Sequence, residues 1–335
     1  MVQLRFIHAN YRLDQVKIVL DHYSIDELSF GEITPYLKIS TNSIKVEYQN
    51  KLIHDYNFPY SVGAFTVALT PANKLVLFKD RESDLSNGQA MLIAYNLTEL
   101  PLDIEVDNKV VIDDLASLKL KKTKIQLGSL FHTLSVVQNE QYVVKSLPFL
   151  PSNRSKNSLF IYNDAGGVKH MMVQERADDV LAKDFSPVDY MGEWHLIAQF
   201  PQPYEAAFNC VRQKAIYTLL DDGVKVHNIC YSGITGDKIE NEVYGKAVIV
   251  DKSKPAALRV EFPNSFGYQT EQANYLVHYV KYDVFSLVGS PSRASLYILS
   301  RKTKLAKHDI IKLIGLANSL GYDMNKLVFL RDKMM

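Results

Sequence analysis

The side chains that could act in catalysis or bind a metal are scattered along this sequence. The nine histidines are His8, His22, His54, His132, His170, His195, His227, His278 and His308. None of them forms an H-x-x-x-H pair or an H-E-x-x-H helix, the spacings that place two imidazoles on one metal ion. The sequence also has no G-x-S-x-G elbow, P-loop or dinucleotide fingerprint. We therefore expect no metal, no cofactor and no enzymatic activity.

The two cysteines, Cys210 and Cys230, stand in apolar runs on either side of Asp221-Asp222-Gly223. A two-residue turn at Asp222-Gly223 would place Cys230 opposite Ala215, roughly 16 Å from Cys210 at about 3.3 Å per residue. Cα atoms more than about 7 Å apart cannot be bridged without backbone movement. A disulfide would therefore need a bulge or an irregular strand start. The pairing is uncertain, and two separate thiols are the alternative.

The composition is that of a folded protein with balanced charge. The chain has 335 residues, 47% of them hydrophobic, with 38 Lys plus Arg against 37 Asp plus Glu. The near-zero net charge gives no overall electrostatic attraction to nucleic acid or to an anionic membrane surface, so we expect no nucleic-acid partner. The start of the sequence lacks a basic segment followed by an apolar run, and no window is apolar enough for a membrane helix. The cellular location stays unknown.

Alternating strands and short turns predict an all-β chain, and the first half contains an internal repeat. Residues 3–21 match residues 89–107 at a constant offset of 86. The identical pairs are Gln3/Gln89, Ile7/Ile93, Asn10/Asn96, Ile18/Ile104 and Asp21/Asp107. In each copy an apolar run ends at Asn and is followed by a strand with one apolar and one polar face. We predict two β-sandwich units, 1–86 and 87–165, and a linker over 166–185.

The first copy resembles a bacterial domain family of unknown function that occurs in tandem in exported and surface proteins. The resemblance rests on Arg5–Asn10, Val16–Asp21 and Gly31–Tyr36. The second copy has drifted, since Ala94 replaces His8. The resemblance implies no activity. It implies a surface or interaction module, with a peripheral membrane or a protein as the partner class.

Residues 186–332 predict an antiparallel barrel of eight strands with one late helix. Asp222-Gly223 between apolar runs is a strong hairpin signal. Eight strands close a barrel whose interior is wide enough for one small ligand. Apolar residues at steps of three and four from Leu305 to Leu320 predict the helix, and Gly321 stands where its C-cap belongs.

The motifs of this second half resemble, in order, those of the lipocalin family, in its bacterial outer-membrane and apolipoprotein D branch. Tyr190–Trp194 matches the G-x-W opening, and Tyr217–Gly223 matches Y-s-L-x-D-D-G. Asn241–Ala247 resembles the E-G-K-A segment. Leu287–Arg293 and Leu296–Arg301 match L-V-G-x-P-s-r and L-W-I-L-S-R. Two positions depart from the pattern: His195 replaces a Tyr and Tyr297 replaces a Trp, which makes an inherited ligand preference less secure.

The resemblance implies that Trp194 and Arg301 pack together at the closed end of the barrel, with the guanidinium over the indole. If Trp194 points inward, strand alternation turns Leu196 and Ala198 inward as well. Weaker register arguments add further rings, and the predicted ligand-binding set is Trp194, Leu196, Ala198, Tyr244, Phe262, Tyr275, Tyr279 and Tyr297.

We expect the barrel to bind, store or transport a small hydrophobic ligand, either a fatty acid or a lysophospholipid. Loops at the open end, including 201–208 and 263–272, would gate entry, and tyrosine hydroxyls near the mouth would meet the polar head. Two other hypotheses remain. The whole chain is a structural or adhesion-type interaction protein with a filled barrel, or the barrel is an isomerase-like enzyme, which would need Cys210 or His195 inside the cavity.

Overall fold

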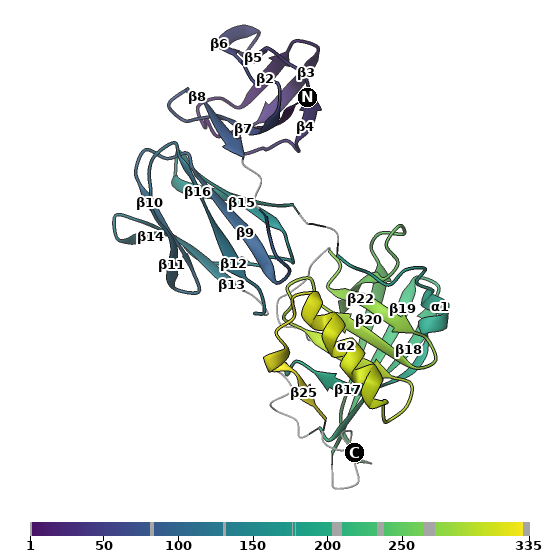
Figure 1. Ribbon diagram of the computed structural model, residues 1–335. Helices are drawn as coiled ribbons and strands as arrows, with labels where there is room; N and C mark the ends of the chain where they lie inside the picture. Colours follow the sequence, from purple (N-terminus) through teal and green to yellow (C-terminus); the bar gives the residue numbers. More distant parts are fainter. Residues whose placement is uncertain are drawn as a thin grey trace.

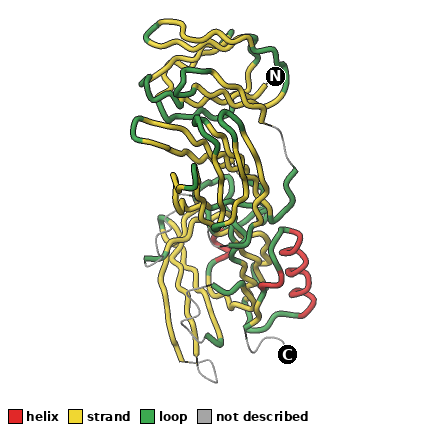
Figure 2. Tube along the Cα trace, turned by 90° about the vertical axis from the view of Figure 1, so that its left-hand side faces the viewer, coloured by secondary structure: helices red, strands yellow, loops and turns green. Residues whose placement is uncertain are grey.

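The computed structural model describes residues 2–80, 84–129, 132–175, 177, 179–202, 210–232, 238–263 and 272–330. The chain is mostly β-structure: two small β-sandwiches come first and a barrel follows (Figure 1). Within these residues the two α-helices belong to the barrel unit, as Figure 2 shows. No described helix is long and apolar enough to cross a membrane.

The first sandwich consists of two four-stranded sheets. One has the order β4-β1-β7-β8 and the other β3-β2-β5-β6. The strands are β1 (Val2–His8), β2 (Gln15–Leu20), β3 (Tyr23–Ser29), β4 (Leu37–Ile39), β5 (Ser43–Tyr48), β6 (Lys51–Asn57), β7 (Gly63–Leu69) and β8 (Leu75–Asp80). β1 and β7 run parallel, and the other pairs are antiparallel.

The second sandwich has the same strand order with every label raised by eight: β12-β9-β15-β16 and β11-β10-β13-β14. Its parallel pair, β9 with β15, corresponds to β1 with β7. The strands are β9 (Gln89–Asn96), β10 (Leu102–Val106), β11 (Lys109–Leu115), β12 (Leu120–Gln126), β13 (His132–Gln138), β14 (Gln141–Phe149), β15 (Lys156–Asp164) and β16 (Gly167–Glu175). Identical topology supports the duplication inferred from the sequence.

The residues that are identical in the two copies have the same structural role. The Asn10 side chain accepts from the backbone N–H two residues later, and Asn96 does likewise, so each Asn turns the chain out of its first strand. Asp21 accepts hydrogen bonds from the N–H of Asn42 and the hydroxyl of Ser43. Asp107 accepts from the N–H of Thr133 and pairs with His132. Each Asp thus fastens a hairpin turn to the start of another strand.

The predicted linker over 166–185 is too long. Gly167–Glu175 forms β16, which pairs with β15 along its whole length. The glycine pair that suggested a domain end is instead the turn of this hairpin, with Gly167 at φ +127° and the N–H of Gly166 bonded to Asp164.

The two sandwiches pack against each other through β1 and β9, which are therefore buried on both faces. In β1, Phe6 faces the core of the first sandwich and Ile7 faces the joint; in β9, Leu92 and Ile93 do the same. The joint cluster consists of Ile7, Ala9, Ala68, Phe78, Met91, Ile93, Tyr95, Leu97, Phe160 and Tyr162. Burial on both faces explains why these strands are continuous apolar runs.

The C-terminal unit is a closed barrel of eight strands in the order β18-β19-β20-β21-β22-β23-β24-β17, closed by pairing of β17 with β18. Helix α1 (Pro187–Tyr190) precedes it, and α2 (Lys307–Ser319) packs on its outer surface. A 3-10 turn (Met324–Lys326) and β25 (Val328–Phe329), which adds to β17, end the described chain. The barrel strands are β17 (Gly192–Gln199), β18 (Arg212–Leu220), β19 (Gly223–Ser232), β20 (Lys238–Ile249), β21 (Ala257–Glu261), β22 (Tyr275–Lys281), β23 (Phe285–Gly289) and β24 (Leu296–Ser300).

Cys210 and Cys230 form a disulfide, with their Cα atoms 5.4 Å apart. The β18–β19 turn lies at Asp221-Asp222, one residue earlier than the expected turn, because Leu220 pairs with Gly223. Cys230 is therefore opposite Gln213. The chain also bends before β18 begins at Arg212, and this irregular strand start brings Cys210 to its partner. Of the two alternatives, the structure has the disulfide.

Candidate functional site

The predicted pair, Trp194 and Arg301, is in contact beside the interior cluster of the barrel. The Trp194 side chain is fully buried, and the Arg301 guanidinium lies 3.8 Å from its ring centroid. Arg301 also donates to the backbone carbonyls of Tyr282, Glu193 and Asp189, which holds the cation in place. Gly192 has φ +93°, and a Cβ there would come within 3.3 Å of Arg301, so this position of the G-x-W motif favours glycine.

Beside Trp194, four hydroxyl groups form an unbranched hydrogen-bonded chain. The Tyr217 hydroxyl oxygen lies 3.0 Å from that of Tyr275, which lies 3.2 Å from that of Tyr190, which lies 3.1 Å from the Ser286 hydroxyl. Ser286 can donate onward to the carbonyl of Tyr279 at 3.4 Å. The Tyr190 ring stacks on Tyr217 and tilts against Trp194 at 5.0 Å. We call these four residues the hydroxyl chain.

Burial keeps the hydroxyl chain neutral. Loss of water contact raises the pKa of Tyr217 to about 12, and burial also raises the pKa values of Tyr190 and Tyr275. Tyr190 and Tyr217 are buried, whereas Tyr275 is half-buried. The chain therefore presents uncharged hydroxyls, and Tyr275 is the tyrosine among them that keeps some exposure.

Five of the eight predicted ligand-binding residues pack in the interior cluster: Trp194, Leu196, Phe262, Tyr275 and Tyr297. Trp194 and Leu196 are buried, and the other three are half-buried. The structure thus brings these five together around one interior; their role in ligand binding stays a prediction.

The remaining three predicted residues lie elsewhere. Tyr244 is 45% exposed, and its ring stacks on that of His227 with the ring centroids 4.2 Å apart. It faces outward because Ala247, three positions away on the same strand, faces inward. Ala198 follows a bulge in the β17–β24 pairing, and Tyr279 follows one in β22–β23. Both pack in the cluster beneath α2, where the Lys312 ammonium donates to the Tyr279 hydroxyl.

Sequence reasoning missed Tyr190, Tyr217 and Ser286. Strand alternation could have predicted Tyr217, because it lies two residues from Ala215 on the same face of β18, and Ala215 pairs with Trp194. Tyr190 lies in α1 rather than in a strand, so strand alternation could not place it. Neither residue considered for an isomerase-like site places a reactive group in the interior: Cys210 is in the disulfide and has no free thiol, and His195 lies on the opposite face of β17 from the inward-facing Trp194 and Leu196.

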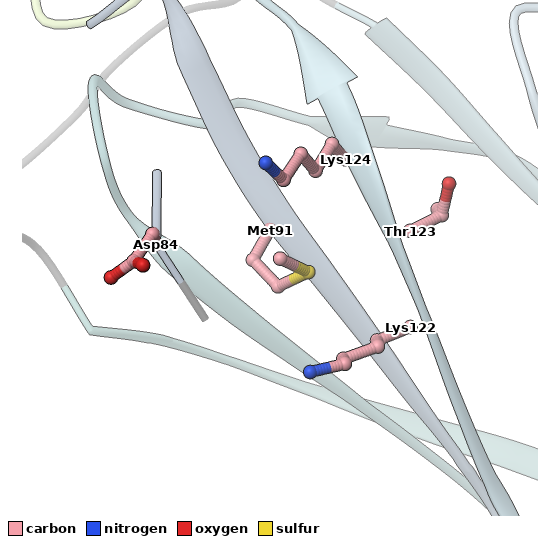
Figure 3. A pocket seen from close by; sticks show the side chains of 5 residues that line it. All are labelled: Asp84, Met91, Lys122, Thr123 and Lys124. Carbon is pink, nitrogen blue, oxygen red and sulfur yellow. The ribbon is translucent and has the colours of Figure 1, made fainter. Parts of the chain in front are cut away.

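Outside the barrel, a pocket of about 360 Å³ lies on the second sandwich, and its lining residues are Asp84, Met91, Lys122, Thr123 and Lys124. Figure 3 shows both lysines projecting past Met91, while Thr123 points the other way. Within the described part of the chain, no group of three His, Cys, Asp or Glu side chains could hold a metal ion. Most of each expected gating loop, 203–209 and 264–271, lies outside the described residues.

Comparisons with known proteins identify the barrel. The model of the lipocalin-like domain family matches residues 188–332. Temperature-induced lipocalin-1 of Arabidopsis thaliana is 34% identical over 157 residues, which cover 46% of this chain and 82% of that protein. The chain belongs to the lipocalin family. The outer membrane lipoprotein Blc of Escherichia coli K12 is 29% identical over 155 residues, 45% of this chain and 82% of its own length.

Among solved structures, lobster apocrustacyanin A1 aligns with 43% of this chain and 78% of its own, at 16% identity and a TM-score of 0.34. The residues that the family model matches, 188–332, are those of the barrel unit. Lipocalins in general bind or transport small hydrophobic molecules, and that general property applies to this barrel.

Proposed function

We propose that this lipocalin binds and carries a single-chain lipid, a fatty acid or a lysophospholipid, inside its barrel. The observation that supports this most strongly is the mixed exposure of the interior cluster. Trp194 and Leu196 are buried, whereas Val260, Phe262 and Tyr297 pack against the same cluster but are only half-buried. An apolar wall that solvent reaches, above a sealed floor, suits an elongated hydrophobic molecule.

Binding would be reversible capture without covalent chemistry. Burial of apolar lipid surface contributes about 25 cal/mol per Å², so a long hydrocarbon chain supplies most of the affinity. The disulfide fixes the start of β18 against the end of β19 and so stiffens this part of the barrel wall. The N-terminal sandwiches would act as a surface or interaction module that presents the barrel, which would leave a peripheral membrane or a protein as their partner.

The single tryptophan of the chain allows a direct test. The delipidated full-length protein is titrated with oleate and with a lysophospholipid, and Trp194 emission is followed. We expect saturable binding of one molecule per chain at micromolar concentrations. Absence of binding would leave the alternative hypothesis, a structural protein with a filled barrel.

Two matched variants locate the site. Ala215→Phe adds a ring in the interior next to Trp194, and Thr218→Phe adds the same ring on the exposed face of the same strand. We expect Ala215→Phe to weaken binding at least tenfold and Thr218→Phe to leave it unchanged. Equal effects of the two variants would place the lipid outside the barrel.

A further inference from the structure

The hydroxyl chain has one more proton than its internal hydrogen bonds can use. Tyr217, Tyr275, Tyr190 and Ser286 each carry one hydroxyl proton, and three hydrogen bonds join them in a row. When all three bonds run in the same direction, the fourth proton leaves at one end. It goes either from Ser286 to the Tyr279 carbonyl, a long contact of 3.4 Å, or outward from Tyr217.

The two directions of the chain make its Tyr217 end adaptable. When the chain runs toward Tyr279, the Tyr217 oxygen can accept a hydrogen bond; when it runs the other way, the Tyr217 hydroxyl donates one. All members of the chain can reverse together because each hydroxyl is both a donor and an acceptor. A ligand hydroxyl or carbonyl oxygen at this end would therefore find a partner, and an acceptor would replace the weak contact to Tyr279.

The charges around the hydroxyl chain disfavour ionised head groups. Among the described residues, no cationic side chain hydrogen-bonds to the chain, and the nearby Arg301 guanidinium already donates to three backbone carbonyls. An ionised carboxylate or phosphate buried here would lose its water and gain no hydrogen bond from a cation, since Arg301 acts on Tyr190 only through space. An uncharged hydroxyl or carbonyl pays a far smaller cost.

We propose that the barrel binds a long-chain lipid with an uncharged hydroxyl or carbonyl terminus, and that this terminus lies at the closed end, bonded to the Tyr217–Tyr275 end of the hydroxyl chain. The hydrocarbon then extends toward the open end past Phe262 and Tyr297. This inference rests on the proposed lipid-binding function and narrows it: a fatty acid would enter in its protonated form. It also reverses the orientation that the sequence suggested, with the polar head at the mouth.

Trp194 reports the orientation, because a bromine atom quenches indole emission only at close range and the indole forms the floor next to Tyr190. The full-length protein is titrated with 2-bromo-1-hexadecanol and with 16-bromo-1-hexadecanol. We expect the 2-bromo compound, which carries bromine beside its hydroxyl, to quench the bound state more strongly. Stronger quenching by the 16-bromo compound would overturn the proposal.

The hydroxyl itself is tested by comparing 1-hexadecanol with 1-hexadecene in calorimetric titrations. We expect the alcohol to bind about 2- to 12-fold more tightly, which is the value of one hydrogen bond. Tyr217→Phe, which removes the terminal hydroxyl of the chain, should abolish this preference while 1-hexadecene still binds, which verifies that the barrel is folded. Tyr244→Phe, which removes an exposed hydroxyl from the outer wall, is the matched control and should keep the preference.

The outcomes separate the two proposals. If neither hexadecanol, hexadecene, oleate nor a lysophospholipid binds to the delipidated protein, the lipid-binding function is wrong. If these lipids bind but Tyr217→Phe keeps the wild-type preference for the alcohol, the function stands and the hydroxyl chain is only structural.

Discussion

Each of the two joints in this molecule contains one buried arginine, and the surroundings of the two arginines differ. In the joint between the sandwiches, Arg5 is 2% exposed and donates to Thr66 of its own unit and to Tyr95, Ser158 and Glu175 of the next. Its guanidinium lies over three aromatic rings, and the apolar joint cluster surrounds it.

In the joint between the second sandwich and the barrel, Arg293 is 1% exposed and pairs with Asp179 of the connecting segment. It also donates to the carbonyls of Ser290 and Leu320 inside the barrel unit. The two units themselves meet through hydrogen bonds to backbone carbonyls, among them Asn153 to Pro291 and Asn87 to Ser319.

This difference separates a joint that belongs to a hydrophobic core from one that is mainly polar. Burial of apolar surface makes the folding of two units cooperative, whereas a few hydrogen bonds exchange readily with water. We therefore expect the two sandwiches to unfold together and the barrel to unfold by itself. Far-UV circular dichroism follows both transitions, and Trp194 emission follows only the barrel.

The largest expected effect is that of Arg5→Ala. The substitution removes four hydrogen bonds from a buried site and leaves Tyr95 and Ser158 without this partner, which should cost about 3–5 kcal/mol of the free energy of unfolding. The loss should appear in the sandwich transition measured by circular dichroism in urea. Arg12→Ala, at a residue outside this network, is the control. A matching shift of the Trp194 transition would show that the barrel is coupled to this joint.

The disulfide should stabilise only the barrel unit. It closes a loop of 20 residues in the β18–β19 hairpin, so the double variant Cys210→Ala/Cys230→Ala should lower barrel stability by about 3 kcal/mol. Urea unfolding followed by Trp194 emission measures this loss. Dithiothreitol should reproduce it in the wild-type protein and have no effect on the double variant. A shift in the sandwich transition would contradict independent unfolding.

The sequence predicted most of this architecture because its signals were local. Period-two alternation, Asp-Gly at a hairpin and the ordered lipocalin motifs lie within short windows, and the repeat pairs such as Asp21/Asp107 mark equivalent turns. Three of the predicted ligand-binding residues lie outside the interior cluster for the opposite reason. Bulges before Ala198 and Tyr279 and the register at Tyr244 each change the face of a strand, and these features depend on pairing between distant segments.

The hydroxyl chain shows the same limit. Its members come from α1, β18, β22 and β23, and each is an ordinary residue within its own element. Only closure of the barrel brings the four hydroxyls within hydrogen-bonding distance. The disulfide shows the limit as well. It forms because the hairpin turn lies one residue earlier than expected and because β18 has an irregular start.

Acid should weaken both units in parallel, since burial strongly lowers the pKa of His8 in the sandwiches and of His278 in the barrel. Burial lowers the pKa of His8 to about 4 and that of His278 to about 4, from 6.5. As pH falls from about 6.5 to 4, the unfolded chain binds a proton that the folded chain does not, so stability decreases over that window, by on the order of 2 kcal/mol per histidine. Urea unfolding at several pH values measures it. His8→Gln should flatten only the sandwich transition, and His278→Gln only that of the barrel.

The smallest effect expected tests the contact between the second sandwich and the barrel directly. Gly321 has φ +84°, and a Cβ there would lie 2.2 Å from the backbone nitrogen of Gly88, so Gly321→Ala must push the two units apart or strain the chain. We expect a cost of about 1–2 kcal/mol and faster protease cleavage in the segment between β16 and α1. Gly315→Ala is the matched control, because its Cβ would meet no atom within 4 Å and should stabilise α2 by about 1 kcal/mol. A lower stability of the barrel, measured by Trp194 emission, without faster cleavage between β16 and α1 would contradict this expectation. The joint between the second sandwich and the barrel would then be more rigid than its contacts imply.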